Sequence, residues 1–415
     1  MTSTNPLAVA FDLGTTTIAA SLVDLATGAR LAATSSLNPQ RPWGADVLSR
    51  LQAAADPLVL AALKETLAAE MERMAEELLA RVGAWPQQFT RVALAGNPAM
   101  EQIALGLPSA SLAYPPFRPQ FKSAREAATG ELGWRRDLPA FLFPLPSGFV
   151  GGDLVAFLYG CRDSARPGTL YLDLGTNAEM AIFDGERYLA TSAAAGPAFE
   201  GGNLSCGMAA LPGAIAGVSL EGDRLKLATI GGAPARGICG SGVLEAVAAL
   251  LEAGVIDPTG RIKAPGEIGS NLANRIQEVE GGTAFVLHRD AKATVYLSQE
   301  DIRALQLAKG ALKAGMEILL ARAGLGFETL TRVVLTGSFG AVLAPQVLKT
   351  VGVFNKNMVI VSGFIREGAL CGVERFLLEP EGERALEEFS AGIKVLPLSG
   401  TAAFEKRFLA NLNFD

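Results

Sequence analysis

The sequence predicts an α/β protein built from two lobes of related topology, each a mixed sheet flanked by helices. Two observations predict this fold. A hairpin-like stretch at residues 8–23 has a second copy at 169–183, and the strand-like run 91–96 has a counterpart at 332–337. In both halves a hairpin, helices, a strand ending in a glycine turn and a further helix follow in the same order. Such internal duplication favours two similar lobes with a cleft between them.

Each hairpin-like stretch is an apolar run, then Asp-Leu-Gly-Thr, then a second apolar run. This pattern is typical of a strand, a tight turn and a returning strand. Gly14 and Gly175 allow the backbone to turn sharply and to approach a ligand closely. Asp12 and Asp173 end the first strands, where a carboxylate can hold hydrated Mg²⁺ against phosphates. Backbone N–H groups and side chains after each glycine can donate to phosphate oxygens. These residues are Thr15, Thr16, Thr176 and Asn177. Two facing hairpins of this kind would form a nucleotide clamp.

Composition limits the class of protein. Of the 415 residues, 49% are hydrophobic and 19% are charged, which favours a large core over disorder. The net charge of −6, without a basic block, argues against a nucleic-acid partner. No uninterrupted apolar run reaches the roughly 18 residues of a membrane span, and the N-terminus does not resemble an export signal. We therefore expect a cytoplasmic protein with no membrane partner. The expected domains are 1–165, 166–380 and a C-terminal segment, 381–415, that packs on the body.

Cysteine and histidine are too few for most metal chemistry. The four cysteines show no CxxC pair and no iron–sulfur spacing, so we interpret them as reduced, small packing residues. They are Cys161, Cys206, Cys239 and Cys371. The single histidine, His288, cannot build a metal cluster alone. Zinc chemistry, haem ligation and a Ser/His/Asp triad are therefore poor interpretations.

Further segments are interpreted from local pattern. Residues 38–46 are rich in chain breakers and place Arg41 and Asp46 beside an aromatic, which fits either an active-site mouth or an ordinary surface loop. Apolar residues at steps of three and four predict a long helix over 56–82. Ser298 to Asp301 is a capping box that predicts a helix of about 25 residues.

Several loops of the second half are candidates for ligand contact. The small residues of 193–202 allow a ligand to approach, and Glu200 in that loop is a candidate for positioning a water. The glycine-rich run 237–242 opens a helix, which suits either an anion site or a packing turn. The helix that begins near residue 299 leads into the turn after Thr336. Lys309 on this helix could therefore reach a nucleotide bound at that turn.

The paired hairpins and the run Gly337-Ser-Phe-Gly340 resemble the superfamily of actin, sugar and acetate kinases and heat-shock chaperone ATPases, which have an actin-like (RNase H-like) fold. Over about residues 7–375 the chain looks like the ATPase part of the reductive activators of corrinoid proteins. The segments that carry this narrower resemblance are AFDLGTTTIAASLVDLATG, SLNPQRPWGADVLSRL, GFVGGD, LYLDLGTNAEMAI, AAGPAFEGG, GICGSGVLEAV, DIRALQLAKGAL and VVLTGSFG.

The resemblance implies that ATP helps to drive one electron onto the Co(II) corrinoid of a methyltransferase, restoring Co(I). Asp12 and Asp173 would serve Mg²⁺, and we assign catalytic roles to these two residues and to Glu200. The phosphates would contact Gly14, Thr15, Thr16, Gly175, Thr176 and Asn177. The nucleoside side would be lined by Gly240, Gln306, Lys309, Gly337, Phe339 and Gly340.

The expected partner is a corrinoid protein or corrinoid methyltransferase, and a homodimer is left open. Family members usually carry an iron–sulfur domain that supplies the electron, and this sequence holds no such cluster motif. A separate ferredoxin or flavoprotein would then donate, or the chain is a fragment, or it has another task. Residues 362–369 also depart from the expected Asn- and Gly-rich pattern. A small-molecule kinase of the same fold and a chaperone-like nucleotide switch remain alternatives.

Overall fold

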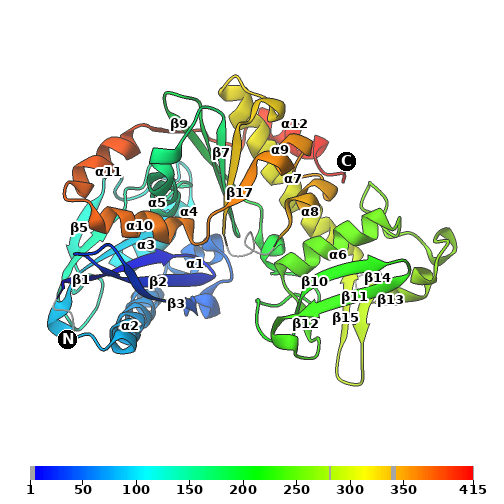
Figure 1. Ribbon diagram of the computed structural model, residues 1–415, viewed down its shortest axis with the longest axis horizontal. Helices are drawn as coiled ribbons and strands as arrows, with labels where there is room; N and C mark the ends of the chain where they lie inside the picture. Colours follow the sequence, from blue (N-terminus) through cyan, green and yellow to red (C-terminus); the bar gives the residue numbers. More distant parts are fainter. Residues whose placement is uncertain (1–4, 280–281, 338–342, 415) are drawn as a thin grey trace. The chain divides into compact units, whose positions relative to one another are not determined.

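The computed structural model describes residues 5–279, 282–337 and 343–414. Its contacts divide the chain into two compact units, coloured by sequence in Figure 1. The first unit contains residues 1–165, 186–190 and 367–396, and the second contains 166–185, 191–366 and 397–415. Residues 367–380 therefore pack with the first unit, although the sequence analysis placed them in the second lobe. The expected domain limits themselves remain a prediction.

The first unit is built on one mixed sheet of six strands. Across the sheet these are β3 (Arg30–Leu37), β2 (Thr17–Asp24), β1 (Leu7–Leu13), β4 (Phe89–Gly96), β6 (Pro139–Leu142) and β5 (Arg125–Ala128). The central strand β1 is antiparallel to β2 and parallel to β4. Its two faces alternate with the pleat: Val9 and Phe11 join a core with α2, whereas Ala8 and Ala10 point to the opposite face. Helices on both sides explain why β1 is almost wholly apolar.

The helices of the first unit are α1 (Val47–Ala53), α2 (Pro57–Val82), α3 (Pro98–Leu105), α4 (Ala110–Ala113), α5 (Gly152–Cys161), α10 (Gly368–Leu378) and α11 (Gly382–Ala391). The predicted long helix is confirmed as α2. Asp56 caps it by accepting from the Leu58 N–H at 2.8 Å, and Gly83 ends it in the left-handed conformation. Its buried stripe packs over β2 and β3, joins the same core as Val9 and Phe11 of β1, and includes Leu67, Met71 and Met74.

In the second unit, another six-stranded sheet repeats this pairing. Its strands are β17 (Ser362–Phe364), β16 (Arg332–Thr336), β7 (Thr169–Leu174), β8 (Ala178–Phe183), β9 (Tyr188–Ala193) and β18 (Ile393–Val395). Of these, β18 and residues 188–190 of β9 count with the first unit. As with β1, the first hairpin strand β7 is antiparallel to its hairpin partner and parallel to a later strand, β16. Asp12 pairs with Ala95 in one sheet, and Asp173 pairs with Thr336 in the other. The two halves of the sequence thus form the same local arrangement.

Two smaller sheets and five helices complete the second unit. The sheets are β11 (Arg224–Thr229), β10 (Ala214–Glu221) and β12 (Gly237–Ile238), and β13 (Ile276–Val279), β14 (Gly282–Arg289) and β15 (Thr294–Ser298). The helices are α6 (Gly240–Glu252), α7 (Gln299–Arg322), α8 (Pro345–Thr350), α9 (Lys356–Val361) and α12 (Ala402–Ala410). The predicted capping box is confirmed at the start of α7, where Ser298 and Asp301 each accept from the other's backbone N–H.

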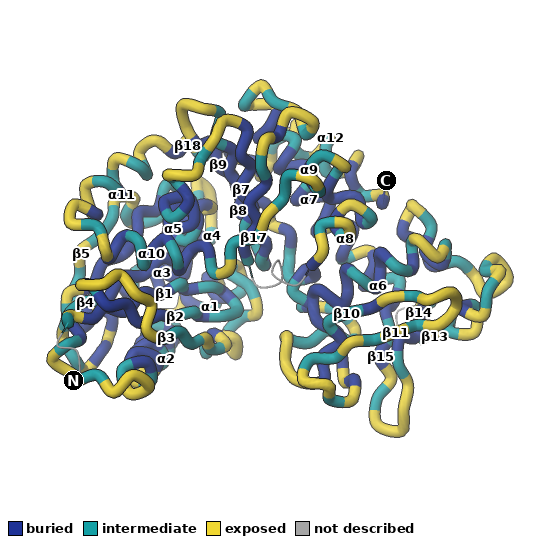
Figure 2. The backbone as a smooth tube through the Cα atoms, in the orientation of Figure 1, coloured by how far each residue is buried: buried dark blue, intermediate teal, exposed yellow. Residues whose placement is uncertain are grey.

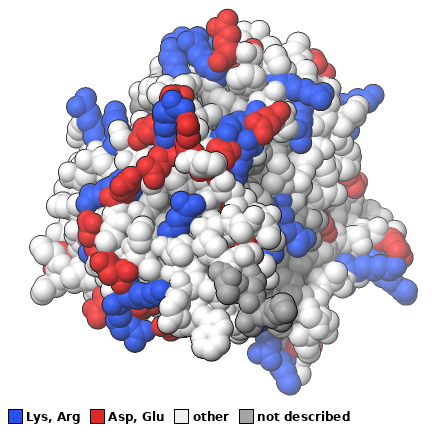
Figure 3. All heavy atoms as spheres, turned by 60° about the vertical axis from the view of Figure 1, so that its left-hand side comes forward, with Lys and Arg blue, Asp and Glu red and all other residues white. Residues whose placement is uncertain are grey.

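Burial and charge follow from this arrangement. The central strands of the large sheets are buried, and the exposed residues gather in turns and outer helices (Figure 2). Acidic and basic side chains are interspersed on the face that Figure 3 presents. Within the described part of the chain, no helix is long and apolar enough to cross a membrane.

Helices α5 and α10 approach so closely that only glycine fits at their crossing. A Cβ on Gly372 would lie 1.7 Å from the carbonyl oxygen of Ala156. We expect Gly372→Ala to lower the free energy of unfolding by about 2 kcal/mol or more, because the backbones must separate. Thermal and urea unfolding would measure this. Gly266→Ala, whose Cβ meets nothing within 4 Å, is the control. Equal stability of the two variants would contradict the close packing.

Candidate functional site

The first hairpin turn lies where β1 ends and α3 begins. Asp12 is half-buried near the end of β1, and Gly14 to Thr16 form the turn into β2. The Asn97 side chain donates from Nδ2 to Thr15 Oγ1 at 3.0 Å and also caps α3 by accepting from Met100. The β4–α3 junction therefore holds the turn, as parallel strands that end at one sheet edge commonly do at ligand sites.

Three successive carbonyl groups of this turn are held by buried side chains or backbone. Asn38 donates from its backbone N–H to Thr16 O at 2.8 Å and from Nδ2 to Gly14 O at 2.9 Å. Arg50 donates from Nη2 to Thr15 O at 2.6 Å. In a trans peptide the N–H points opposite to the carbonyl, so these bonds direct the next three N–H groups to the other side of the turn. That arrangement suits an anion.

The loop that supplies Asn38 was identified in the sequence as a breaker-rich segment, as a possible active-site mouth and as part of a segment that carries the family resemblance. Sequence reasoning singled out Arg41 and Asp46 there, but the structure gives the contacts with the turn to Asn38 and Arg50 instead. Arg41 is exposed, and Asp46 caps α1 by accepting from the Ser49 N–H at 2.9 Å. The only signal for Arg50 was a charged residue in an otherwise apolar face of a short helix.

The second hairpin turn is held differently. Asp173 lies half-buried near the end of β7, and the Gly175 N–H donates to Asn177 O at 3.2 Å. The hydroxyl of Thr176 donates to the carboxylate of Glu200. Glu200 belongs to the short 3-10 helix Pro197–Glu200, so the loop predicted to contact a ligand does meet the turn.

Two further glycines pack beside this turn, Gly337 against the turn itself and Gly240 against the Pro197–Glu200 helix. Gly337 follows β16 with φ +111°, and a Cβ there would lie 2.5 Å from Leu174 O and 3.1 Å from Asp173 Oδ1. Gly240 begins α6, and a Cβ there would lie 1.9 Å from Phe199 O. The second unit thus brings together, from four separate segments, the predicted residues Asp173, Gly175, Thr176, Asn177, Glu200, Gly240 and Gly337.

Gln306 and Lys309 form hydrogen bonds with residues near the C-terminus. Both are buried on α7. Gln306 Nε2 donates to Leu412 O at 2.9 Å, and Lys309 Nζ donates to Asn413 O and lies over the Phe414 ring. These side chains hold the last residues of the described chain, and their role toward a nucleoside stays a prediction. Phe339 and Gly340 lie outside the described residues.

The residues of both turns fit phosphates and Mg²⁺. Asp12 and Asp173 offer the hard oxygen ligands that Mg²⁺ prefers. At Gly14 a Cβ would lie 2.4 Å from Thr17 O, so the first turn needs a glycine to keep its shape, whereas a Cβ at Gly175 would make only ordinary contacts of 3.5 Å or more. The four cysteines form no disulfide with one another, and two of them, Cys161 and Cys239, are buried.

Two carboxyl groups, those of the buried Glu101 and the half-buried Asp153, interact near the end of β4. Glu101 on α3 is fully buried and its Oε1 accepts from the Gly96 N–H at 3.0 Å, whereas its Oε2 finds no partner among the described residues. Burial raises the pKa of Glu101 well above its ordinary value, and loss of solvent raises the pKa of Asp153 to about 6. A Cβ on Gly152 would lie 2.3 Å from Glu101 Oε1, so the start of α5 packs directly on this carboxyl.

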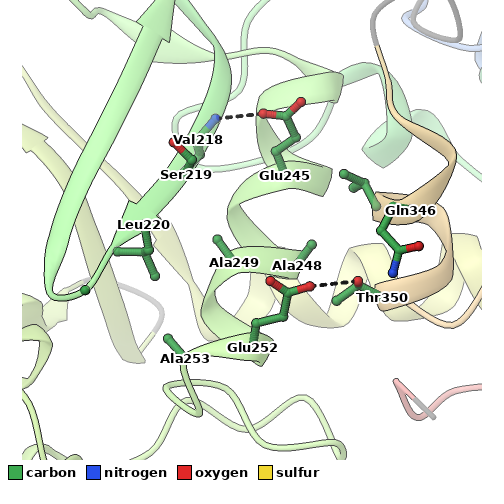
Figure 4. Close-up of a pocket in the computed structure, with 12 residues that line it drawn as sticks. Val218, Ser219, Leu220, Glu245, Ala248, Ala249, Glu252, Ala253, Gln346 and Thr350 are labelled. Atoms are coloured by element: carbon green, nitrogen blue, oxygen red, sulfur yellow. Dashed lines mark hydrogen bonds between the residues drawn. The ribbon is translucent and has the colours of Figure 1, made fainter.

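A separate pocket of about 470 Å³ lies in the second unit between β10, α6 and α8 (Figure 4). Glu245 accepts from the Val218 N–H at 2.9 Å, and Glu252 accepts from the Thr350 hydroxyl at 3.0 Å. The described residues that line it include none of the predicted site residues. Pocket shape therefore does not point to the hairpin turns, which were identified by sequence and hydrogen bonding.

Two family models cover the chain almost from end to end. Residues 7–162 match the RACo middle region, and residues 168–415 match the C-terminal domain of RACo, the ASKHA domain. The chain belongs to the RACo family. The expected fold class is confirmed as an actin-like (ASKHA) α/β domain with mixed sheets.

Named relatives of this RACo-family chain act on corrinoid proteins. The corrinoid activation enzyme RamQ of Eubacterium limosum is 30% identical over 387 residues, covering 90% of this chain and 64% of RamQ. The [Co(II) methylated amine-specific corrinoid protein] reductase of Methanosarcina barkeri is 26% identical, covering 83% of this chain and 65% of the reductase. The solved reductive activator for corrinoid, iron-sulfur protein is 28% identical with a TM-score of 0.87, covering 100% of this chain and 67% of the activator. The chain thus spans just under two thirds of the length of the curated relatives.

The raised pKa of Asp153 predicts a pH-dependent stability. Folding favours the protonated form of Asp153. Its carboxyl group therefore does not lower the free energy of unfolding below pH 4, and it lowers that free energy increasingly as the pH rises toward about 6. We expect Asp153→Asn to gain stability over the unsubstituted protein between pH 4 and pH 7, by on the order of 2 kcal/mol. Urea unfolding at several pH values would measure the difference.

The control for this experiment is Asp223→Asn, at an exposed position of the β10–β11 turn. A difference between Asp153→Asn and the unsubstituted protein that stays constant from pH 4 to pH 7 would contradict the prediction.

Proposed function

We propose that this RACo-family chain is the ATP-dependent part of a reductive activator, which returns the Co(II) corrinoid of a methyltransferase to Co(I). The observation that carries the proposal is the match of RACo family models to residues 7–162 and 168–415. Support comes from relatives named for corrinoid activation and for reduction of a Co(II) corrinoid protein. The corrinoid is the substrate, and it would be presented by a partner protein.

The two hairpin turns would hold Mg-ATP. Asp12 and Asp173 would bind hydrated Mg²⁺, and the turn N–H groups with the hydroxyls of Thr15 and Thr176 would donate to phosphate oxygens. Glu200, which accepts from Thr176, would orient a water toward the terminal phosphate. Bound Mg-ATP supplies the free energy that drives an otherwise unfavourable reduction.

That free energy would act through differential binding of the corrinoid protein. A nucleotide-bound state that binds the Co(I) form more tightly than the Co(II) form raises the effective reduction potential. Each increment of about 1.4 kcal/mol by which binding favours the Co(I) form raises the one-electron reduction potential by about 59 mV. The electron would come from a separate ferredoxin or flavoprotein.

The experiment combines the full chain, Mg-ATP, a Co(II) corrinoid methyltransferase and a low-potential reductant, and follows the Co(I) absorption band. We expect Co(I) to form only with ATP. Loss of ATP dependence, or absence of ATP binding, would contradict the proposal. A phosphorylated metabolite formed without any effect on cobalt would instead favour the small-molecule kinase alternative, which needs a carboxylate base beside a substrate hydroxyl.

The metal roles predict a matched set of variants. We expect Asp12→Asn and Asp173→Asn each to weaken ATP binding about tenfold or more when Mg²⁺ is present and far less when it is chelated, because the carboxylates act through the ion. Calorimetric titration would measure both conditions. Asp56→Asn is the control, because asparagine caps α2 as well as the exposed Asp56 does. Equal losses with and without Mg²⁺ would contradict metal roles for these carboxylates.

A further inference from the structure

Arg50 is an arginine in the interior of the first unit whose partners are all neutral. Its side chain is fully buried, with 0% of its surface exposed. The guanidinium donates to Thr15 O at 2.6 Å and to Gly44 O at 2.9 Å, and Nη1 lies 3.5 Å from Gln40 Oε1. None of the ion pairs formed by the described residues includes Arg50. Through space, Asp46 and Arg41 act on it in opposite directions.

A buried and unpaired cation is unusual, because loss of hydration opposes its charge and buried charges are normally paired. Loss of hydration also lowers the pKa of Arg50 to about 10, so the group still carries its charge at neutral pH. The first unit therefore holds a positive charge at full strength directly behind the Gly14–Thr16 turn. In the poorly screened interior that charge acts over a longer distance than a surface charge.

The hydrogen bonds place the guanidinium charge on the carbonyl side of the first turn. Arg50 binds the carbonyl of Thr15 from behind, and Asn38 binds the carbonyls on either side of it. The N–H groups of the same peptides face the opposite side of the turn. The positive ends of these peptide dipoles and the guanidinium charge therefore favour an anion at the same place, with no reorganisation when it arrives.

We propose that Arg50 is a positioning residue that makes the first turn select a polyanionic phosphate chain over an uncharged ligand. It acts through Thr15 by orienting the turn, and through space by its charge. This inference rests on the proposed nucleotide function and adds to it a residue that sets selectivity for phosphate charge. A purely structural Arg50 would fasten loop 38–46 to the turn, and its removal would weaken all ligands alike.

The first test compares Arg50→Met with the unsubstituted full chain by calorimetric titration of ATP, ADP and adenosine at one ionic strength. Methionine fills much of the same space without charge or donors. We expect ATP affinity to fall about tenfold or more, ADP affinity to fall less, and adenosine affinity to change less than about twofold. Equal losses for all three ligands, or a lower melting temperature with unchanged affinities, would overturn the proposal.

The matched control is Arg136→Met. Arg136 also donates to a backbone carbonyl, Phe89 O at 3.1 Å, and also carries its charge within the first unit. Phe89 begins β4, whereas the turn lies beside the other end of that strand, at Gly96. We expect Arg136→Met to leave the ratio of ATP to adenosine affinity unchanged. A similar change of ratio in both variants would mean that total charge, and not Arg50, sets the selectivity.

A second variant keeps the test decisive if Arg50→Met does not fold. Arg50→Lys retains a cation, but burial lowers the pKa of lysine toward neutrality far more readily than that of arginine. We expect the ATP affinity of Arg50→Lys, divided by that of the unsubstituted protein, to fall about threefold or more between pH 6 and pH 9. The same ratio for adenosine should stay flat. A flat ATP ratio would overturn the proposal, whereas an unsubstituted protein that binds no ATP would contradict the proposed function itself.

Discussion

The hydrogen bonds to the carbonyl oxygens of Gly14, Thr15 and Thr16 fix the direction of the peptide groups in the first hairpin turn. A turn between two strands has peptide groups that the sheet does not pair, and their direction must be set by something outside the ladder. Asn38 and Arg50 set it from a loop and a short helix, and both are buried. Because a peptide is planar, the orientation of one side of the turn determines the other. The burial of Arg50, which is unfavourable by itself, follows from this requirement.

The second unit reaches a similar turn by other means. There the Thr176 hydroxyl donates to Glu200, and glycines let neighbouring backbones approach the turn. At Gly337 and Gly240, a single Cβ would clash with carbonyl oxygens of the turn or its neighbouring loop. The two units therefore share the strand order, but different side chains hold the hairpin turn in each. This difference explains why the repeated hairpin motif did not identify Asn38 and Arg50, which support only the first turn.

The chain that contains these turns belongs to the RACo family, and its named relatives act on corrinoid proteins. The chain spans 64% of one curated relative and 65% of the other. In the proposed activity, this chain would bind the nucleotide, and the electron would come from another protein or domain. Such a division requires the nucleotide site to affect a partner through differential binding.

The sequence by itself determined the fold class, the duplicated hairpins and the helices α2 and α7. These follow from local rules: apolar period, strand-turn-strand spacing, and caps such as Asp56 and Ser298 act within a few residues. Only the tertiary structure decided that Arg50 is buried behind Thr15 and that Lys309 contacts the C-terminal segment. The hydrogen-bond partners of such polar side chains are distant in sequence, and hydrophobic period and motif spacing do not predict which carbonyl group a side chain will bind. For the same reason Glu101, a carboxyl buried by the packing of α5, carried no signal in the sequence.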